Sequence, residues 1–185
     1  MRIIAGESKN RIIKTKKGTS TRPTLSNVRE ALFSMITPEI SGARFLDLFS
    51  GSGIISLEAL SRGAKKAIMI EKDSESLKII IENINSLGYE NKSRAYKNDV
   101  LSALNILGRK EEKFDIIFMD PPYDMEICTK ILESIEKNKL LDKDGLIICE
   151  HYFSEKMKDN IGNYKKINEK DYRKKVLSFY KENIE

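Results

Sequence analysis

Apolar and polar positions follow two patterns that alternate along this chain, and these patterns predict strands and helices in turn. Short apolar runs have the length of buried strands, at 44–48, 66–70, 93–97, 114–119 and 146–150. Between them, apolar residues three or four positions apart predict helices at 54–61, 74–87, 100–107 and 127–137. Two further runs, 164–168 and 175–181, predict a closing antiparallel pair. Repeated alternation of strand and helix indicates a doubly wound α/β fold with a mostly parallel sheet.

The N-terminal residues depart from that alternation. Two β-prone runs, 2–5 and 11–15, flank a polar turn and predict a hairpin. The apolar spacing from Leu25 to Ile36 predicts a helix that Thr24 caps and Pro38 ends. We therefore expect a single domain over 1–185, with a basic hairpin extension at 1–24 and the α/β core at 25–185.

A glycine-containing turn joins the first core strand to its helix, within FLDLFSGSGIISLEAL at 45–60. Strand, glycine turn and helix form the first half of a βαβ unit, and glycine lets a ligand come close to the backbone. Ser56 stands where a dinucleotide fingerprint has Gly or Ala, and Glu71 stands where its acidic residue is expected. Enzymes that use NAD and enzymes that use S-adenosylmethionine (SAM) share this pattern, since both cofactors carry adenosine. A turn without a ligand is the alternative.

Acidic residues follow several predicted strands, and the ends of parallel strands meet at one edge of a sheet. Glu71 is suited to accept both ribose hydroxyls of an adenosine. Asp99 is suited to accept from an adenine amine, with the backbone N–H of Val100 beside it. Asp47 would lie near the amino-acid part of a SAM-like cofactor. The alternative is that these carboxylates simply face water at the strand ends.

The run Asp120-Pro121-Pro122-Tyr123 follows the most apolar strand. The two prolines fix the backbone and remove two N–H donors, so that their carbonyls point outward. A carboxylate, a carbonyl and a flat ring suit a planar base with an exocyclic amine, whose hydrogens they can hold while Tyr123 stacks on the base. Methyl transfer to such an amine depends on positioning and electrostatics and requires no metal. A rigid turn with a surface tyrosine is the structural alternative.

Composition places the chain among ordinary soluble domains, with 33% charged and 40% apolar residues among 185. The net charge is +5, and residues 1–30 alone carry eight Lys and Arg against two Glu. This basic segment indicates a polyanion partner, or else a solvated basic tail. No apolar run approaches a membrane span or a signal peptide. Cys128 and Cys149 are expected to be two buried thiols in a reducing cytosol, and His151 to be an ordinary strand-end histidine.

Taken together, these motifs resemble a known class. FLDLFSGSG, IEKD, NDV and DPPY, in this order and spacing, resemble the class I, Rossmann-like, SAM-dependent amino-methyltransferases. RIIAGESKNRII, TRPT and VREALFSMI before them resemble the RsmD family, and this likeness covers essentially the whole chain. The resemblance implies a seven-stranded sheet with one antiparallel strand. It also implies methylation of the N2 amine of one guanine in bacterial 16S ribosomal RNA, with SAM as cofactor.

The resemblance also assigns roles to residues. Those implied for the cofactor are Asp47, Phe49, Gly51, Gly53, Glu71, Lys72, Asp99 and Val100. Those implied for catalysis are Asp120, Pro121, Pro122 and Tyr123. Those implied for RNA phosphates are Arg2, Lys9, Arg11, Lys14, Lys16, Lys17 and Arg22. The target base would be turned out of its stack.

We expect a cytoplasmic monomer without a metal, acting on 16S rRNA within a small-subunit assembly particle. Three other functions remain open from the sequence. An N6-adenine methyltransferase acting on DNA or RNA would keep the same site residues. A non-catalytic RNA-binding assembly factor would keep the fold without turnover. An NAD-dependent oxidoreductase would need an acid or base for hydride transfer, which Asp-Pro-Pro-Tyr does not supply.

Overall fold

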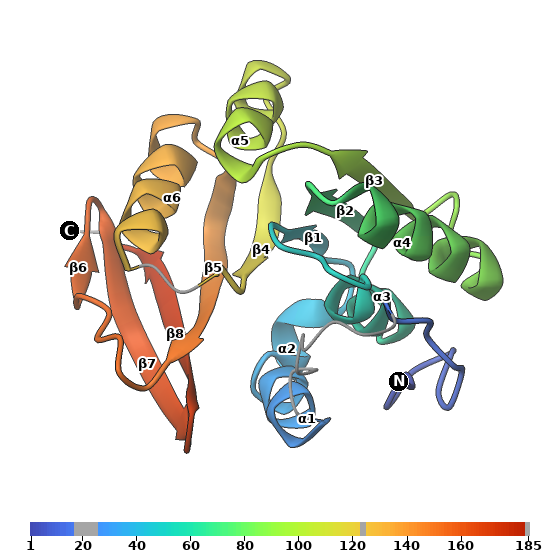
Figure 1. The fold of residues 1–185 in the computed structure, drawn as a ribbon. Coiled ribbons are helices and arrows are strands. Elements are labelled where there is room, and N and C mark those ends of the chain that lie inside the picture. The colour runs from blue at the N-terminus through green and yellow to red at the C-terminus, as the bar shows by residue number, and fades with distance from the viewer. Residues whose placement is uncertain (17–25, 123–124, 184–185) are drawn as a thin grey trace.

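The computed structural model describes residues 1–16, 26–122 and 125–183, and it has the expected α/β architecture (Figure 1). The helices are α1 (Ser26–Met35), α2 (Thr37–Ile40), α3 (Ile54–Ser61), α4 (Ser74–Leu87), α5 (Val100–Arg109) and α6 (Met125–Lys137). The strands are β1 (Arg44–Asp47), β2 (Lys66–Glu71), β3 (Ser93–Lys97), β4 (Phe114–Met119), β5 (Leu141–Tyr152), β6 (Asn160–Ile161), β7 (Tyr164–Tyr172) and β8 (Lys175–Glu182).

All of these strands lie in one sheet, in the order β3-β2-β1-β4-β5-β8-β7-β6. The first five are parallel, and β8 enters between β5 and β7 antiparallel to both. The expected fold class is confirmed, but the expected count of seven strands is wrong by one. The additional strand is the two-residue β6, which pairs antiparallel with the start of β7. A pair of residues is too short to leave a period-two pattern in the sequence.

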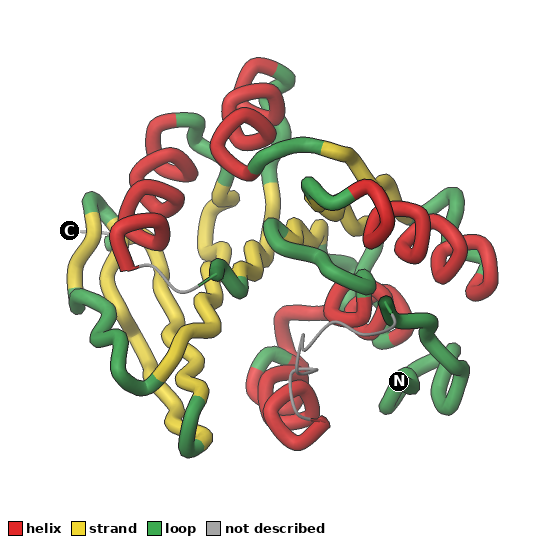
Figure 2. The backbone as a smooth tube through the Cα atoms, viewed as in Figure 1, coloured by secondary structure: helices red, strands yellow, loops and turns green. Residues whose placement is uncertain are grey.

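The sheet is covered on both faces (Figures 1 and 2), as a parallel sheet requires. Successive residues of β1 show this directly. Phe45 packs in the apolar cluster shared with α1, α2, α3 and α4, whereas Leu46 packs in the cluster shared with α5 and α6. Both side chains have 0% exposure. The strand order reverses between β1 and β4, and at such a switch point the carboxyl ends of the strands leave room for a ligand.

The first helical segment is divided rather than simply ended at Pro38. Helix α1 ends at Met35, and Pro38 lies in the first turn of the short helix α2. Proline is tolerated there because the N–H groups of a first helical turn have no intrahelical partner. The predicted cap, Thr24, lies outside the described residues. Among the helices that the structure describes, none is long and apolar enough to cross a membrane.

The N-terminal residues reverse direction as predicted, but they form less than a regular hairpin. A single antiparallel bridge joins Arg2 and Ile12. Ile3 and Ile13, each 1% exposed, insert into the core cluster beside α1, α3 and α4. The extension is therefore packed on the core along this stretch, because its two isoleucines supply apolar surface that the core buries.

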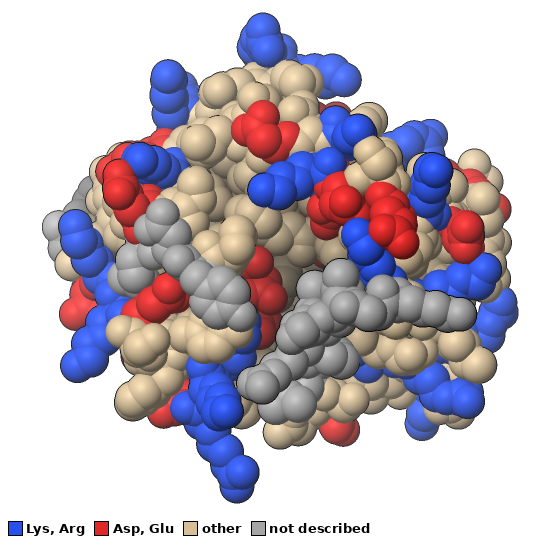
Figure 3. Space-filling model, viewed as in Figure 1, with Lys and Arg blue, Asp and Glu red and all other residues tan. Residues whose placement is uncertain are grey.

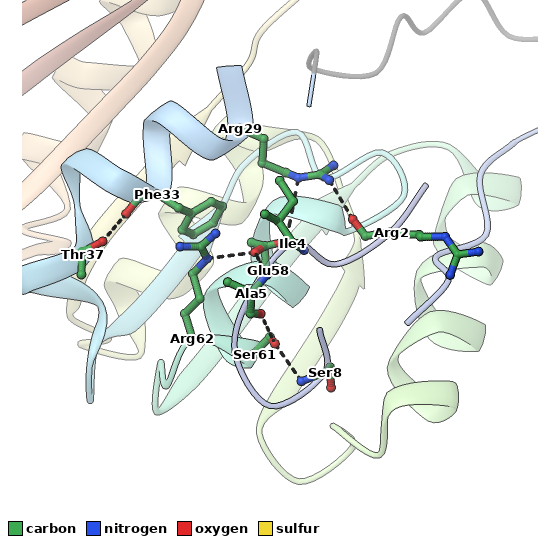
Figure 4. A network of polar contacts seen from close by, with 10 residues as sticks. All are labelled: Arg2, Ile4, Ala5, Ser8, Arg29, Phe33, Thr37, Glu58, Ser61 and Arg62. Carbon is green, nitrogen blue, oxygen red and sulfur yellow. Dashed lines mark hydrogen bonds and ion pairs between the residues drawn. The ribbon is translucent and has the colours of Figure 1, made fainter. Parts of the chain in front are cut away.

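A buried carboxylate on α3 holds this extension in place (Figure 4). The Oε2 and Oε1 atoms of Glu58 accept from the backbone N–H groups of Ile4 at 2.8 Å and Ala5 at 3.0 Å. Glu58 also receives the Arg62 guanidinium at 2.8 Å and lies 3.9 Å from Nε of the buried Arg29. The side chain of Glu58 has 0% exposure, so these partners replace water.

Candidate active site

The glycine turn after β1 has the open geometry that the sequence predicts. Gly51 and Gly53 both have left-handed backbones, with φ of +55° and +79°. A Cβ built on Gly53 would lie 3.2 Å from the Met69 sulfur, whereas a Cβ built on Gly51 would meet nothing within 4 Å. Gly53 therefore serves the packing of the turn on β2. Gly51 leaves open space above its backbone, which a ligand at the strand ends can use.

Asp47 lies beneath this turn at the end of β1, with 1% exposure. Its Oδ2 accepts from the Ser56 hydroxyl at 3.0 Å, while its Oδ1 has no hydrogen-bond partner among the described residues. Burial raises the pKa of Asp47 to about 7. A buried carboxylate oxygen without a donor is costly, and an amine or ammonium entering beside the turn would supply one. These properties fit the amino-acid end of a SAM-like cofactor.

Glu71 and Asp99 lie at the carboxyl ends of the neighbouring strands β2 and β3. The Oε2 of Glu71 accepts from the Gly51 N–H at 2.8 Å, and its Oε1 accepts from the Asp73 N–H at 2.8 Å. Each carboxylate oxygen can accept a second hydrogen bond, so both remain able to receive a ribose hydroxyl. This arrangement ties the carboxylate directly to the glycine turn.

Asp99 has a local structural role that the sequence analysis did not assign. It caps α5, because its Oδ1 accepts from the Ser102 N–H at 3.0 Å. The hydroxyl and backbone N–H of Ser102 lower the pKa of Asp99. The side chain is exposed, and Val100 follows as the first residue of the helix. The first N–H groups of a helix lack intrahelical acceptors, so the expected adenine contact remains chemically available.

Asp120 is held by a lysine from the other end of the chain. Lys175, the first residue of β8, places its Nζ 3.0 Å from Asp120 Oδ1 and 3.2 Å from Glu150 Oε1. The same Nζ lies 4.5 Å from the centre of the Tyr152 ring. Burial raises the pKa of Asp120, and the charge of Lys175 opposes that rise. For Lys175, burial favours the neutral amine, but the charges of Asp120 and Glu150 outweigh it and raise the pKa.

Sequence reasoning missed Lys175 and Glu150 as members of this site. Glu150 ends an otherwise apolar run and has 1% exposure. An acidic residue within a buried strand requires a nearby cation, so Glu150 in its apolar run indicates that a cationic partner exists. The partner itself was hidden, because 55 residues separate Lys175 from Asp120.

The remaining residues of the expected catalytic and cofactor sets are placed as follows. Pro121 is buried and Pro122 is exposed. Tyr123 lies outside the described residues. Phe49 is half-buried against the cluster beside α5 and α6, and Lys72 is exposed. The structure thus brings Asp120, Glu71, Asp99 and the glycine turn to one edge of the sheet, where Figure 3 shows a central hollow bordered by acidic side chains.

Several of the cations expected to bind RNA also make contacts within the protein. Lys14 pairs with Glu82 on α4, and Lys16 pairs with Asp73 and Glu75. The guanidinium of Arg2 donates to the Asn10 carbonyl, and that of Arg11 to the Ser86 carbonyl. Lys9 is exposed. Lys17 and Arg22 lie outside the described residues.

His151 and the cysteines lie inside the fold. His151 is 3% exposed and its Nε2 lies 2.8 Å from the Ser178 hydroxyl, on the opposite face of β5 from Glu150. Cys128 and Cys149 are free, buried thiols as expected, with their sulfurs 3.7 Å apart. No group of three or more His, Cys, Asp or Glu side chains in the described part of the chain is arranged to hold a metal ion.

A doubly wound sheet with a glycine turn at its switch point and acidic strand ends, in which the antiparallel strand β8 lies between β5 and β7, is the class I methyltransferase fold. Comparison with known proteins supports this fold class and identifies the family to which the chain belongs. Residues 1–181 match the family described as "Conserved hypothetical protein 95". The chain belongs to this family, and its expected membership of the RsmD family is confirmed by its relatives.

The relatives cover most of the chain. YlbH of Bacillus subtilis (strain 168), named as a candidate rRNA methyltransferase, is 35% identical over 98% of both chains. Ribosomal RNA small subunit methyltransferase D of Escherichia coli (strain K12) is 35% identical over 81% of this chain and 74% of that protein. The solved structure of yhhF from Escherichia coli, named as a candidate methyltransferase, superposes with a TM-score of 0.86 at 28% identity, covering 100% of this chain and 99% of the other.

Proposed function

We propose that this chain transfers a methyl group from SAM to the exocyclic N2 amine of one guanine in 16S ribosomal RNA. Relatives whose names specify ribosomal RNA methylation support the reaction class and the kind of substrate. The N2 position is the finer part of the proposal, and it rests on the resemblance of the sequence to the RsmD family. We further infer that the protein acts as a cytoplasmic monomer on a small-subunit assembly particle.

The observation that carries the proposal is the Asp120 carboxylate at the carboxyl edge of the sheet. Lys175 occupies Oδ1 at 3.0 Å, and Oδ2 accepts no hydrogen bond from the described residues. An amine is a poor nucleophile when its lone pair is delocalised into a ring. A carboxylate that accepts the amine hydrogens favours the pyramidal nitrogen, whose lone pair is available. Together with the carbonyl of Pro121, Oδ2 of Asp120 can therefore orient and activate the amine.

The residues that would hold the cofactor fit its chemistry. Glu71 would accept hydrogen bonds from the ribose hydroxyls, and Asp99 would accept one from the adenine amine. Asp47 would accept one from the ammonium of the amino-acid part, and the space beside Gly51 would admit the ligand. Bound SAM would supply a methyl group carried by a sulfonium. The leaving group would be a neutral thioether, which needs no acid to help it depart. The methylated nitrogen then loses one proton to water, so Asp120 positions the amine and is not required to carry a proton away.

The test uses tritiated SAM with small ribosomal subunits from cells that lack this protein. Nuclease digestion and mass spectrometry would locate the label, and N2-methylguanosine at one site is the expected result. N6-methyladenosine would show that the target base is adenine rather than guanine, and the assignment of the site residues would stand. SAM binding without any transfer to rRNA would reject the proposed activity and favour a binding factor.

Asp120→Asn should lower the rate of transfer by about 10²- to 10³-fold, the effect of losing one hydrogen-bonding group that stabilises the transition state, while SAM affinity, measured by calorimetry, stays unchanged. Asp115→Asn is the matched control, since Asp115 lies on the same strand and pairs with Arg44 at the opposite edge of the sheet. Loss of SAM binding in Asp120→Asn would move Asp120 to a cofactor role.

A further inference from the structure

A cationic projection stands beside the candidate active site. The turn between β7 and β8 carries Arg173 and Lys174, both exposed, and Lys170 is exposed on the strand that leads into it. Phe153, at the end of β5, is 59% exposed, and its N–H donates to the Lys174 carbonyl at 3.1 Å. We call these four residues the hairpin tip. In Figure 3 cations project from the lower end of the molecule, where Figure 1 places this turn.

The three cations of the hairpin tip differ from Lys14 and Lys16 of the N-terminal extension. Among the described residues, Lys170, Arg173 and Lys174 have no side-chain ion pair or hydrogen bond, and one acidic residue, Asp171, lies among them. In the extension, by contrast, Lys14 is already matched by a carboxylate of α4. Unpaired exposed cations keep their capacity to bind phosphate, and an exposed aromatic beside them supplies a face on which a base can stack.

The position of the hairpin tip connects it to the chemistry. Lys175 follows Lys174 directly, and its Nζ contacts Asp120 at 3.0 Å. Tyr152 precedes Phe153 and pairs with Lys175 across the β5–β8 ladder. Arg173 has a left-handed backbone, with φ of +64°, at the point where the chain turns back. The tip is therefore adjacent in sequence, through Lys175 and Tyr152, to the residues that surround the Asp120 carboxylate.

We propose that the hairpin tip binds single-stranded RNA next to the modified base, with Phe153 stacked on a neighbouring base and Lys170, Arg173 and Lys174 against phosphates. This inference rests on the proposed function, because it assumes that an RNA base reaches Asp120. It adds a contact surface at the C-terminal end of the sheet, separate from the extension. The combination of an aromatic ring and unpaired cations favours RNA over a protein partner. RNA offers phosphates to the cations and a base that can stack on the ring, whereas an acidic protein surface would match the cations alone.

The test measures binding of 16S rRNA, transcribed in vitro, by filter retention over a range of KCl concentrations. Phe153→Ala should raise Kd by about 5- to 150-fold, the effect of losing one stacked base. Arg173→Gln with Lys174→Gln should reduce the slope of log Kd against log salt by about 1.4, or 0.7 for each phosphate contact. The control is Lys65→Gln with Lys66→Gln, two exposed cations at the opposite edge of the sheet, which should leave the slope unchanged.

Thermal unfolding and SAM affinity should be unchanged in all variants, which separates the contact from misfolding. Equal binding by wild type and tip variants, or no binding by wild type, would overturn the inference. It would also be overturned if the variants lost binding to assembled subunits and kept binding to the bare transcript, since the tip would then contact protein. Tip-dependent RNA binding by a wild type that transfers no methyl group would reject the proposed activity and leave the tip surface standing.

Discussion

At the scale of single residues, Lys175 is the side chain that most changes the picture of the site. Its single positive charge contacts two carboxylates, Asp120 and the buried Glu150, and it lies against the ring of Tyr152. Since an ionised carboxylate accepts hydrogen bonds on both oxygens, whereas a carboxylic acid donates one, the charge state of Asp120 decides whether it can hold an amine. Lys175 is therefore a positioning residue that acts through Asp120.

Substitution of Lys175 should shift the pH dependence of the reaction. Burial raises the pKa of Asp120 and Lys175 opposes that rise, so Lys175→Met should raise the pKa further. The acid limb of kcat should then move to higher pH, and Lys175→Arg should restore it. The Glu150 carboxylate, which also contacts Lys175, is a second titratable group that faces this site from β5.

Lys181→Met on the same strand is the control for that experiment, because Lys181 has no ion pair among the described residues. An unshifted pH profile in Lys175→Met, with the folded state intact by circular dichroism, would reduce Lys175 to a structural ion pair.

Asp47 makes a separate prediction about stability. Its pKa of about 7 in the folded state exceeds the value of about 3.9 expected for an unfolded chain. The favourable contribution of protonated Asp47 is present below about pH 4 and is lost as pH rises to about 7. Asp47→Asn should therefore raise the free energy of unfolding at pH 8, by up to about 4 kcal/mol, and change it little at pH 4. Urea unfolding at the two pH values measures this, and an equal effect at both would contradict the raised pKa.

At the scale of elements, Glu58 shows how α3 fixes the N-terminal extension to the core. Glu58→Ala would remove the acceptors for two backbone N–H groups and leave Arg29 without its counter-charge inside the core. We expect a loss of about 3–5 kcal/mol in the free energy of unfolding, the range for breaking one side of a buried ion pair. Hydrogen exchange should show the amides of Ile4 and Ala5 losing protection first.

Glu82→Ala is the matched control on α4. Glu82 also pairs with the extension, through Lys14, but the two side chains are 55% and 68% exposed. An exposed pair contributes about 0–1 kcal/mol, so this variant should unfold almost as wild type does. Equal destabilisation by the two substitutions would mean that burial of the carboxylate does not decide how strongly it holds the N-terminal extension on the core.

At the scale of the whole molecule, the distribution of charge differs from what the composition suggests. The first 30 residues hold the excess of basic residues, yet Lys14 and Lys16 face carboxylates of α4 and its cap. We expect Lys14→Gln with Lys16→Gln to change the salt slope of RNA binding by less than about 0.7, the value for one phosphate contact. A fall of about 1.4 would show that both lysines leave their carboxylates for RNA phosphates.

The sequence by itself determined the architecture and the position of the candidate site. Burial of strands and helices imposes short-range periods on the chain, and these periods gave nearly every core element between Arg44 and Glu182. The glycine turn and the acidic strand ends lie where those elements stop. Because parallel strands end at one edge, their convergence followed from topology alone.

Only the tertiary structure decided which charged groups meet. The pair of Lys175 with Asp120 joins residues 55 positions apart, and the contact of Ile4 with Glu58 joins residues 54 positions apart. Such contacts leave no local pattern, because they depend on how distant elements are placed by the sheet. The sequence could therefore locate the basic segment, while the fold determined that Lys14 is matched internally and that the free cations stand on the hairpin tip.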